Sequence, residues 1–151
     1  MNEIYIDKLL GYKPLQLWLS GKSRIQINEN TIIEGTERLW LYCQKTISQS
    51  IVMSFDFSVP PIEKKRKIHW HVISTPDFSN FDVVTAIDLD HLGEIQSVYE
   101  TTLNQDKGSD GYDEDSEPYL CLQFLNHYTI WIKFTDSSLS GYELTISKIP
   151  A

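Results

Sequence analysis

The chain has 151 residues, of which 41% are hydrophobic and 12% aromatic, and this composition excludes a disordered chain. Its formal charge of −8 at pH 7 excludes the basic surface with which proteins bind nucleic acid or anionic membranes, and favours a basic partner. The length is that of one domain, so we expect residues 1–151 to form a single β-rich unit with its own core.

The first third of the chain predicts short strands. The N-terminus carries acidic residues where a signal peptide would carry basic ones, and no apolar run is long enough to span a membrane, so a reducing, cytoplasmic location is expected. Residues 15–19 and 25–27 place Leu and Ile at alternate positions around the turn residues 20–23. We interpret them as a hairpin, followed by a further short strand at residues 31–34.

The middle of the chain predicts longer strands. Residues 37–47 carry apolar side chains on both faces, which is typical of a central strand or of one that changes sheets. Residues 50–59 alternate between an apolar face and a face with Ser54 and Asp56, which predicts one side open to water. Residues 68–72, 81–89 and 95–103 also alternate, although the last of these fits helical spacing as well.

Residues 119–134 form the clearest pattern in the chain. Two apolar strands are predicted on either side of a turn at Asn126 and His127, and each strand has one continuous apolar face. With a last strand at residues 142–146, the sequence predicts an all-β protein of about ten strands, an antiparallel β-sandwich or a flattened barrel. Cys43 and Cys121 lie within apolar runs and are expected to be reduced thiols of the core.

An acidic segment, residues 104–118, precedes this hairpin and carries more than half of the net charge of the chain. Such a segment is either a solvated loop or a docking surface for a basic partner, with Tyr112 as its aromatic anchor. A calcium loop fits poorly, because Gly108 stands at a ligand position and the flanks are strands, although clustered carboxylates can bind calcium adventitiously. The acidic side chains of the segment, against the single Lys107, are Asp106, Asp110, Asp113, Glu114, Asp115 and Glu117.

No motif in the chain predicts catalysis. His69 and His71 share one face of a strand and could chelate zinc or iron, but no acidic ligand follows them, so we expect neither a metal nor a cofactor. No nucleophile elbow or glycine-rich phosphate loop is present, and we therefore expect a protein that is not an enzyme. A metal-dependent enzyme using His69 and His71 is kept as an alternative.

In its size, acidity, cysteine use and lack of a catalytic motif the chain resembles bacterial toxin-immunity proteins, in particular those that neutralise contact-dependent growth-inhibition nucleases. This resemblance implies tight binding of a basic toxin domain, through the acidic residues, in the cytoplasm of the producing cell. Another alternative is a sandwich or barrel that binds an apolar ligand in an interior pocket. The pocket would be lined by Trp18, Trp40, Trp70 and Trp131. The sequence leaves the oligomeric state open.

Overall fold

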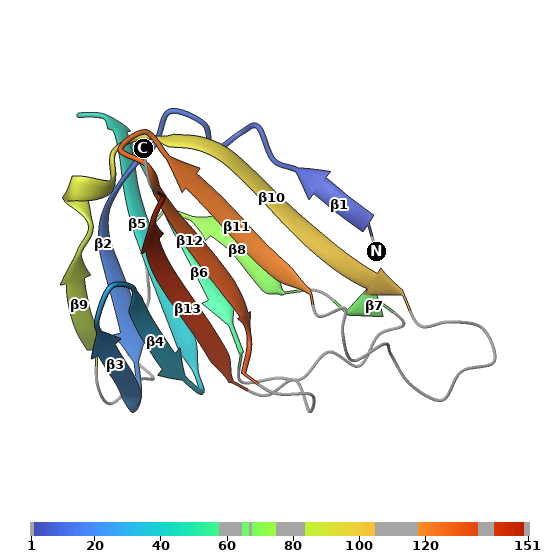
Figure 1. Cartoon of the computed structure of the whole chain (residues 1–151). Helices are drawn as coiled ribbons and strands as arrows, with labels where there is room; N and C mark the ends of the chain where they lie inside the picture. Colours follow the sequence, from blue (N-terminus) through green and yellow to red (C-terminus); the bar gives the residue numbers. More distant parts are fainter. Residues whose placement is uncertain are drawn as a thin grey trace.

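In a computed structural model the chain forms a β-sandwich in which every strand pairing is antiparallel (Figure 1). The structure describes residues 2–57, 65–66, 68–74, 84–104, 118–135 and 141–149. The predicted sandwich is confirmed, and each of its two sheets is an open row of strands rather than a closed barrel. Within the described ranges, no helix has the length and apolarity that a membrane crossing requires.

The larger sheet has eight strands and is built around the predicted hairpin. Leu120 lies opposite Ile132 and Leu122 opposite Ile130, and the turn between them places His127 at a φ of 65°. In spatial order the strands are β1 (Asn2–Tyr5), β10 (Ile95–Asn104), β11 (Tyr119–Phe124), β12 (Tyr128–Phe134), β13 (Tyr142–Lys148), β4 (Thr31–Gly35) and β3 (Ser23–Ile27), with the short β7 (Lys65–Arg66) also paired to β10.

The smaller sheet has five strands. A 3-10 turn, η1 (Asp90–Leu92), follows the last of them in the chain. The central strand of this sheet is β5 (Arg38–Thr46), in agreement with the apolar residues on both faces of residues 37–47. The sequence predicts that residues 50–59 have one face open to water. This is wrong in part, because Val52 and Ser54 on that face are buried. In spatial order the strands are β8 (His69–Ile73), β6 (Gln49–Asp56), β5 (Arg38–Thr46), β2 (Lys13–Ser20) and β9 (Val84–Asp88).

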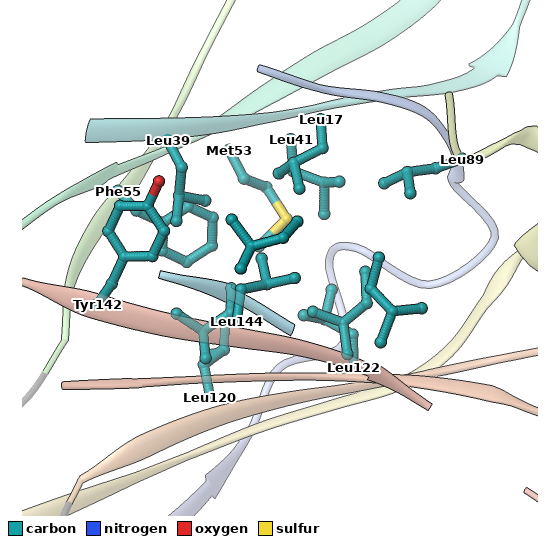
Figure 2. Packing of buried hydrophobic residues seen from close by; sticks show 14 of the residues in the cluster. Leu17, Leu39, Leu41, Met53, Phe55, Leu89, Leu120, Leu122, Tyr142 and Leu144 are labelled. Atoms are coloured by element: carbon teal, nitrogen blue, oxygen red, sulfur yellow. The ribbon is translucent and has the colours of Figure 1, made fainter. Parts of the chain in front are cut away.

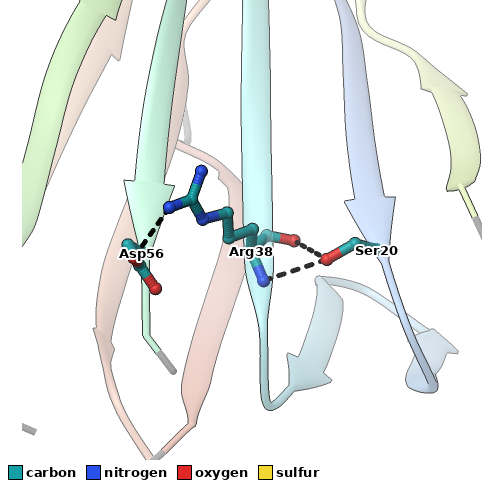
Figure 3. Close-up of polar contacts among 3 residues, drawn as sticks. All are labelled: Ser20, Arg38 and Asp56. Atoms are coloured by element: carbon teal, nitrogen blue, oxygen red, sulfur yellow. Dashed lines mark hydrogen bonds and ion pairs between the residues drawn. The ribbon is translucent and has the colours of Figure 1, made fainter. Parts of the chain in front are cut away.

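The predicted hairpin between residues 15–19 and 25–27 does not form. β2 pairs with β5 and β9 in the smaller sheet, whereas β3 pairs with β4 in the larger one. The chain therefore leaves the smaller sheet after Ser20, makes the β3–β4 hairpin in the other layer, and returns at Arg38. The hydroxyl of Ser20 donates to the carbonyl of Arg38 at 3.1 Å and accepts from its backbone N–H at 3.0 Å, so the exit and the return are held side by side (Figure 3).

The core lies between the two sheets and is made by the inward-facing residues of both (Figure 2). Each large apolar side chain buried there contributes roughly 1.5–3 kcal/mol relative to exposure, which makes this layer the main source of stability. Trp70 also ties the layers together, because its indole N–H donates to the carboxylate of Glu100 at 2.8 Å. Fully buried members include Leu17, Leu39, Leu41, Met53 and Phe55 from the smaller sheet, and Leu120, Leu122, Ile130, Tyr142 and Leu144 from the larger.

Neither cysteine forms a disulfide within the described residues and both are buried, but they lie in different layers. Cys43 belongs to the core between the sheets, where burial raises the pKa of its thiol to about 12. Cys121 is on the outer face of the larger sheet, opposite Tyr99 on one side and Trp131 on the other. The expectation that both thiols belong to the core is therefore wrong for Cys121.

Candidate functional site

An aromatic cluster lies on the outer face of the larger sheet, formed by Tyr5, Tyr99, Tyr119 and Trp131. The ring centroids of Tyr119 and Trp131 are 5.1 Å apart, and Tyr99 lies within 6.2 Å of both, nearly perpendicular to each. Edge-to-face arrangements of this kind are favourable for aromatic rings. The cluster is therefore a packed group of rings that four different strands bring together.

Two members of the aromatic cluster expose much of their surface. Tyr5 is 67% exposed and Trp131 is 36% exposed, while Cys121 below the rings is fully buried. Large aromatic side chains at the surface are enriched in protein–protein interfaces, where they carry a disproportionate part of the binding energy. This arrangement can act as a rigid anchor for another molecule, and the negative π-faces of the rings can bind a lysine or arginine side chain.

The aromatic cluster includes one residue from each of the two strands that the acidic segment connects. The segment starts at the end of β10, which carries Tyr99, and it ends where β11 begins with Tyr119. Pro118, its last residue, is buried. The predicted partner-binding residues themselves lie outside the described residues: Asp106, Asp110, Tyr112, Asp113, Glu114, Asp115 and Glu117.

Basic residues also approach the start of the acidic segment. In β7, Arg66 lies opposite Leu103 and Lys65 opposite Asn104, the last two residues of β10. The backbones of Lys65 and Arg66 are therefore held beside the start of the acidic segment. A test of this surface must therefore distinguish an external basic partner from neutralisation by the chain's own basic residues.

The two histidines considered as metal ligands lie on the outer side of β8. His69 is opposite Asp56 in the register, and His69, His71 and Asp56 line a shallow depression of about 310 Å³. The carboxylate of Asp56 is engaged by the guanidinium of Arg38 at 3.0 Å. In the part of the chain that the structure describes, no group of three histidine, cysteine, aspartate or glutamate side chains is placed to hold a metal ion.

The four tryptophans do not line one interior pocket. Trp18 and Trp40 are opposite each other on the outer face of the smaller sheet, because Leu17, Leu19, Leu39 and Leu41 occupy the inner face. Trp131 is on the outer face of the larger sheet, and Trp70 alone among the four packs against the core between the sheets. The expected tryptophan-lined cavity is therefore wrong.

Comparison of the chain with models of known protein families, with curated proteins and with solved structures found no match. A functional assignment rests on the sequence and on the arrangement of side chains alone. Sequence reasoning selected the acidic segment but missed the aromatic cluster beside it. The signal was present in Trp131, a large aromatic residue between Ile130 and Ile132 and so on the face of its strand turned away from the core.

Proposed function

We propose that the protein is an inhibitory binding module of the toxin-immunity kind, acting in the cytoplasm on a basic toxin domain. The observation that carries the proposal is the position of the aromatic cluster on the two strands that the acidic segment joins. A basic partner would bind the aromatic cluster together with the acidic segment that joins two of its strands. The carboxylates would mimic the phosphates of a nuclease substrate.

The two features would contribute in different ways. Clustered negative charge raises the association rate with a basic surface and fixes its orientation, and this effect weakens as salt screens it. Aromatic anchors mainly slow dissociation, because they bury large rigid surfaces at the centre of an interface. The chain's charge of −8 adds a long-range attraction for the same partner.

The first test is recovery and reconstitution of a partner. The immobilised protein is used to capture basic proteins from the producing strain, and each candidate is purified and titrated by calorimetry at low and high salt. We expect one candidate that binds with a strong salt dependence and whose toxicity on expression is relieved by co-expression of this protein. Capture of no basic protein, or a reconstituted affinity independent of salt, would contradict the proposal.

The second test removes four charges from the acidic segment and compares the result with an equal change elsewhere. We expect the segment variant to weaken partner binding by about tenfold or more at low salt, and the control to change it by less than about twofold. The segment variant carries Asp110→Asn, Asp113→Asn, Glu114→Gln and Asp115→Asn. The control carries Asp7→Asn, Glu34→Gln, Asp90→Asn and Glu94→Gln, all at exposed positions.

The same variant separates docking from neutralisation by the chain's own basic residues. If the run at residues 64–67 pairs with the carboxylates, their removal lowers the free energy of unfolding and leaves partner affinity unchanged. Docking predicts the opposite result, with intact stability and weaker binding. Trp131→Ala is the corresponding test of the aromatic cluster, and we expect it to weaken partner binding by about tenfold or more.

A further inference from the structure

A pocket of about 400 Å³ lies at the edge of the sandwich where both sheets end. β3 is the last strand of the larger sheet and β9 the last strand of the smaller, and they lie on the same side of the molecule (Figure 1). The pocket is formed between them, with Ile25 and Ile27 on one wall and Ile87 on the other. It is distant in the fold from the aromatic cluster, which is carried by β1, β10, β11 and β12.

The pocket exists because the inner face of the larger sheet extends beyond the edge of the smaller sheet that packs against it. Ile25 lies opposite Ile33 in the β3–β4 register and so shares its face, yet Ile33 is fully buried and Ile25 is 39% exposed. Ile27, two residues further along the same face, is 77% exposed. A row of core-type side chains thus continues into a space that none of the described residues fills.

The walls of the pocket are apolar and its rim is polar. Leu89, Ile146 and the ring of Tyr128 complete the apolar lining. A concave apolar space of this size with a few polar groups at its rim is the usual form of a small-molecule site. The ring of His91 packs edge-on against Tyr128 at 5.3 Å, which fixes the inner wall.

The charges at the rim select the kind of ligand. Glu29, in the turn between β3 and β4, and Asp88, at the end of β9, both line the pocket, one from each sheet. Lys148, at the rim, lies over the ring of Tyr128 at 5.8 Å, a position typical of a cation–π contact. Asp88 accepts one hydrogen bond from Gln16, which leaves its carboxylate with further acceptor capacity.

We propose that this edge pocket binds a small aliphatic amine. The apolar chain packs between Ile25, Ile27 and Ile87, and the ammonium group lies between the carboxylates of Glu29 and Asp88. A carboxylate ligand of the same length would instead place its charge beside two like charges. The site is independent of the proposed toxin partner, and either proposal can fail without the other.

The experiment is a titration of the isotope-labelled protein with octylamine, octan-1-ol and octanoate, followed by amide NMR shifts. We expect octylamine to shift the signals of Ile25, Ile87 and Tyr128 and to bind about tenfold more tightly than octanoate and about threefold more tightly than octan-1-ol. Absence of binding, shifts centred elsewhere, or equal affinity for the three compounds would overturn the proposal.

Two variants with matched controls locate the site. Ile27→Gln should weaken octylamine binding by about fivefold, whereas Ile47→Gln, at the fully exposed tip of the β5–β6 hairpin, should leave it unchanged. Glu29→Gln combined with Asp88→Asn should remove the preference for the amine over the alcohol, and Glu34→Gln with Asp90→Asn should preserve it. An unchanged preference in the first pair would show that the rim carboxylates do not select the ligand.

Discussion

The hydroxyl of Ser20 both donates to the carbonyl of Arg38 and accepts from its backbone N–H, at 3.1 Å and 3.0 Å. Ser20 is the last residue of β2 and Arg38 the first of β5, so this one side chain closes the point where the β3–β4 hairpin is inserted. On the other side, the guanidinium of Arg38 reaches Asp56 in β6. The contacts join three neighbouring strands at one end of the smaller sheet.

The first prediction concerns this closure. Ser20 is fully buried, so Ser20→Ala leaves a backbone donor and acceptor without their side-chain partner and should lower the free energy of unfolding by about 1–3 kcal/mol. Asp56→Asn is the comparison, because the ion pair that it weakens is partly solvated and should contribute less than about 1 kcal/mol. Urea denaturation of both variants gives the measurement, and equal losses would contradict this account.

The second prediction concerns Gly35 and Tyr142, which lie opposite each other in β4 and β13. The phenol ring of Tyr142 occupies the space that a Cβ atom at position 35 would need. Gly35→Ala should therefore destabilise the protein by about 1–3 kcal/mol through overpacking. In a Tyr142→Leu background the same substitution should cost about 1 kcal/mol less, and a double-mutant cycle measures this coupling. Additive effects of the two substitutions would rule out the steric explanation.

The third prediction concerns the hydroxyl of Tyr142 itself. This oxygen is buried and has no hydrogen-bond partner among the described residues, and burial, followed by the charge of Glu37, raises the pKa of the phenol. An unpaired buried polar group costs stability, so Tyr142→Phe should raise the free energy of unfolding by about 1 kcal/mol. Thermal and urea denaturation test this expectation, and a loss of stability would mean that the hydroxyl has a partner.

The fold class could be predicted from the sequence because its signal is local. Alternation in residues 119–134 fixes both strands and the turn between them, and apolar residues on both faces of residues 37–47 identify the central strand. Pairing between distant strands could not be predicted in the same way. The turn at residues 20–23 has ordinary hairpin chemistry, but Leu17 and Leu19 are fully buried where β2 pairs with β5 and β9, whereas most of β3 is exposed.

Of the candidate site, only the acidic segment could be predicted from the sequence. The acidic residues lie within one short stretch, residues 106–117, so their accumulation is visible without any structure. The aromatic cluster joins Tyr5, Tyr99, Tyr119 and Trp131 from four strands, and its existence depends on the order β1-β10-β11-β12. The edge pocket depends likewise on β3 and β9 being the terminal strands on one side, which no local pattern determines.

The fourth prediction concerns pH. Burial raises the pKa of the Cys43 thiol from 9.0 to about 12, so between these values the unfolded chain loses this proton while the folded chain keeps it. Stability is therefore fully present below pH 9, and the thiol should lower the free energy of unfolding by about 1.4 kcal/mol for each pH unit above it. Urea denaturation at pH 8, 9 and 10 should show a steeper decline for the wild type than for Cys43→Ala. Other titrating groups act equally in both proteins, so parallel curves would show that the thiol ionises in the folded state.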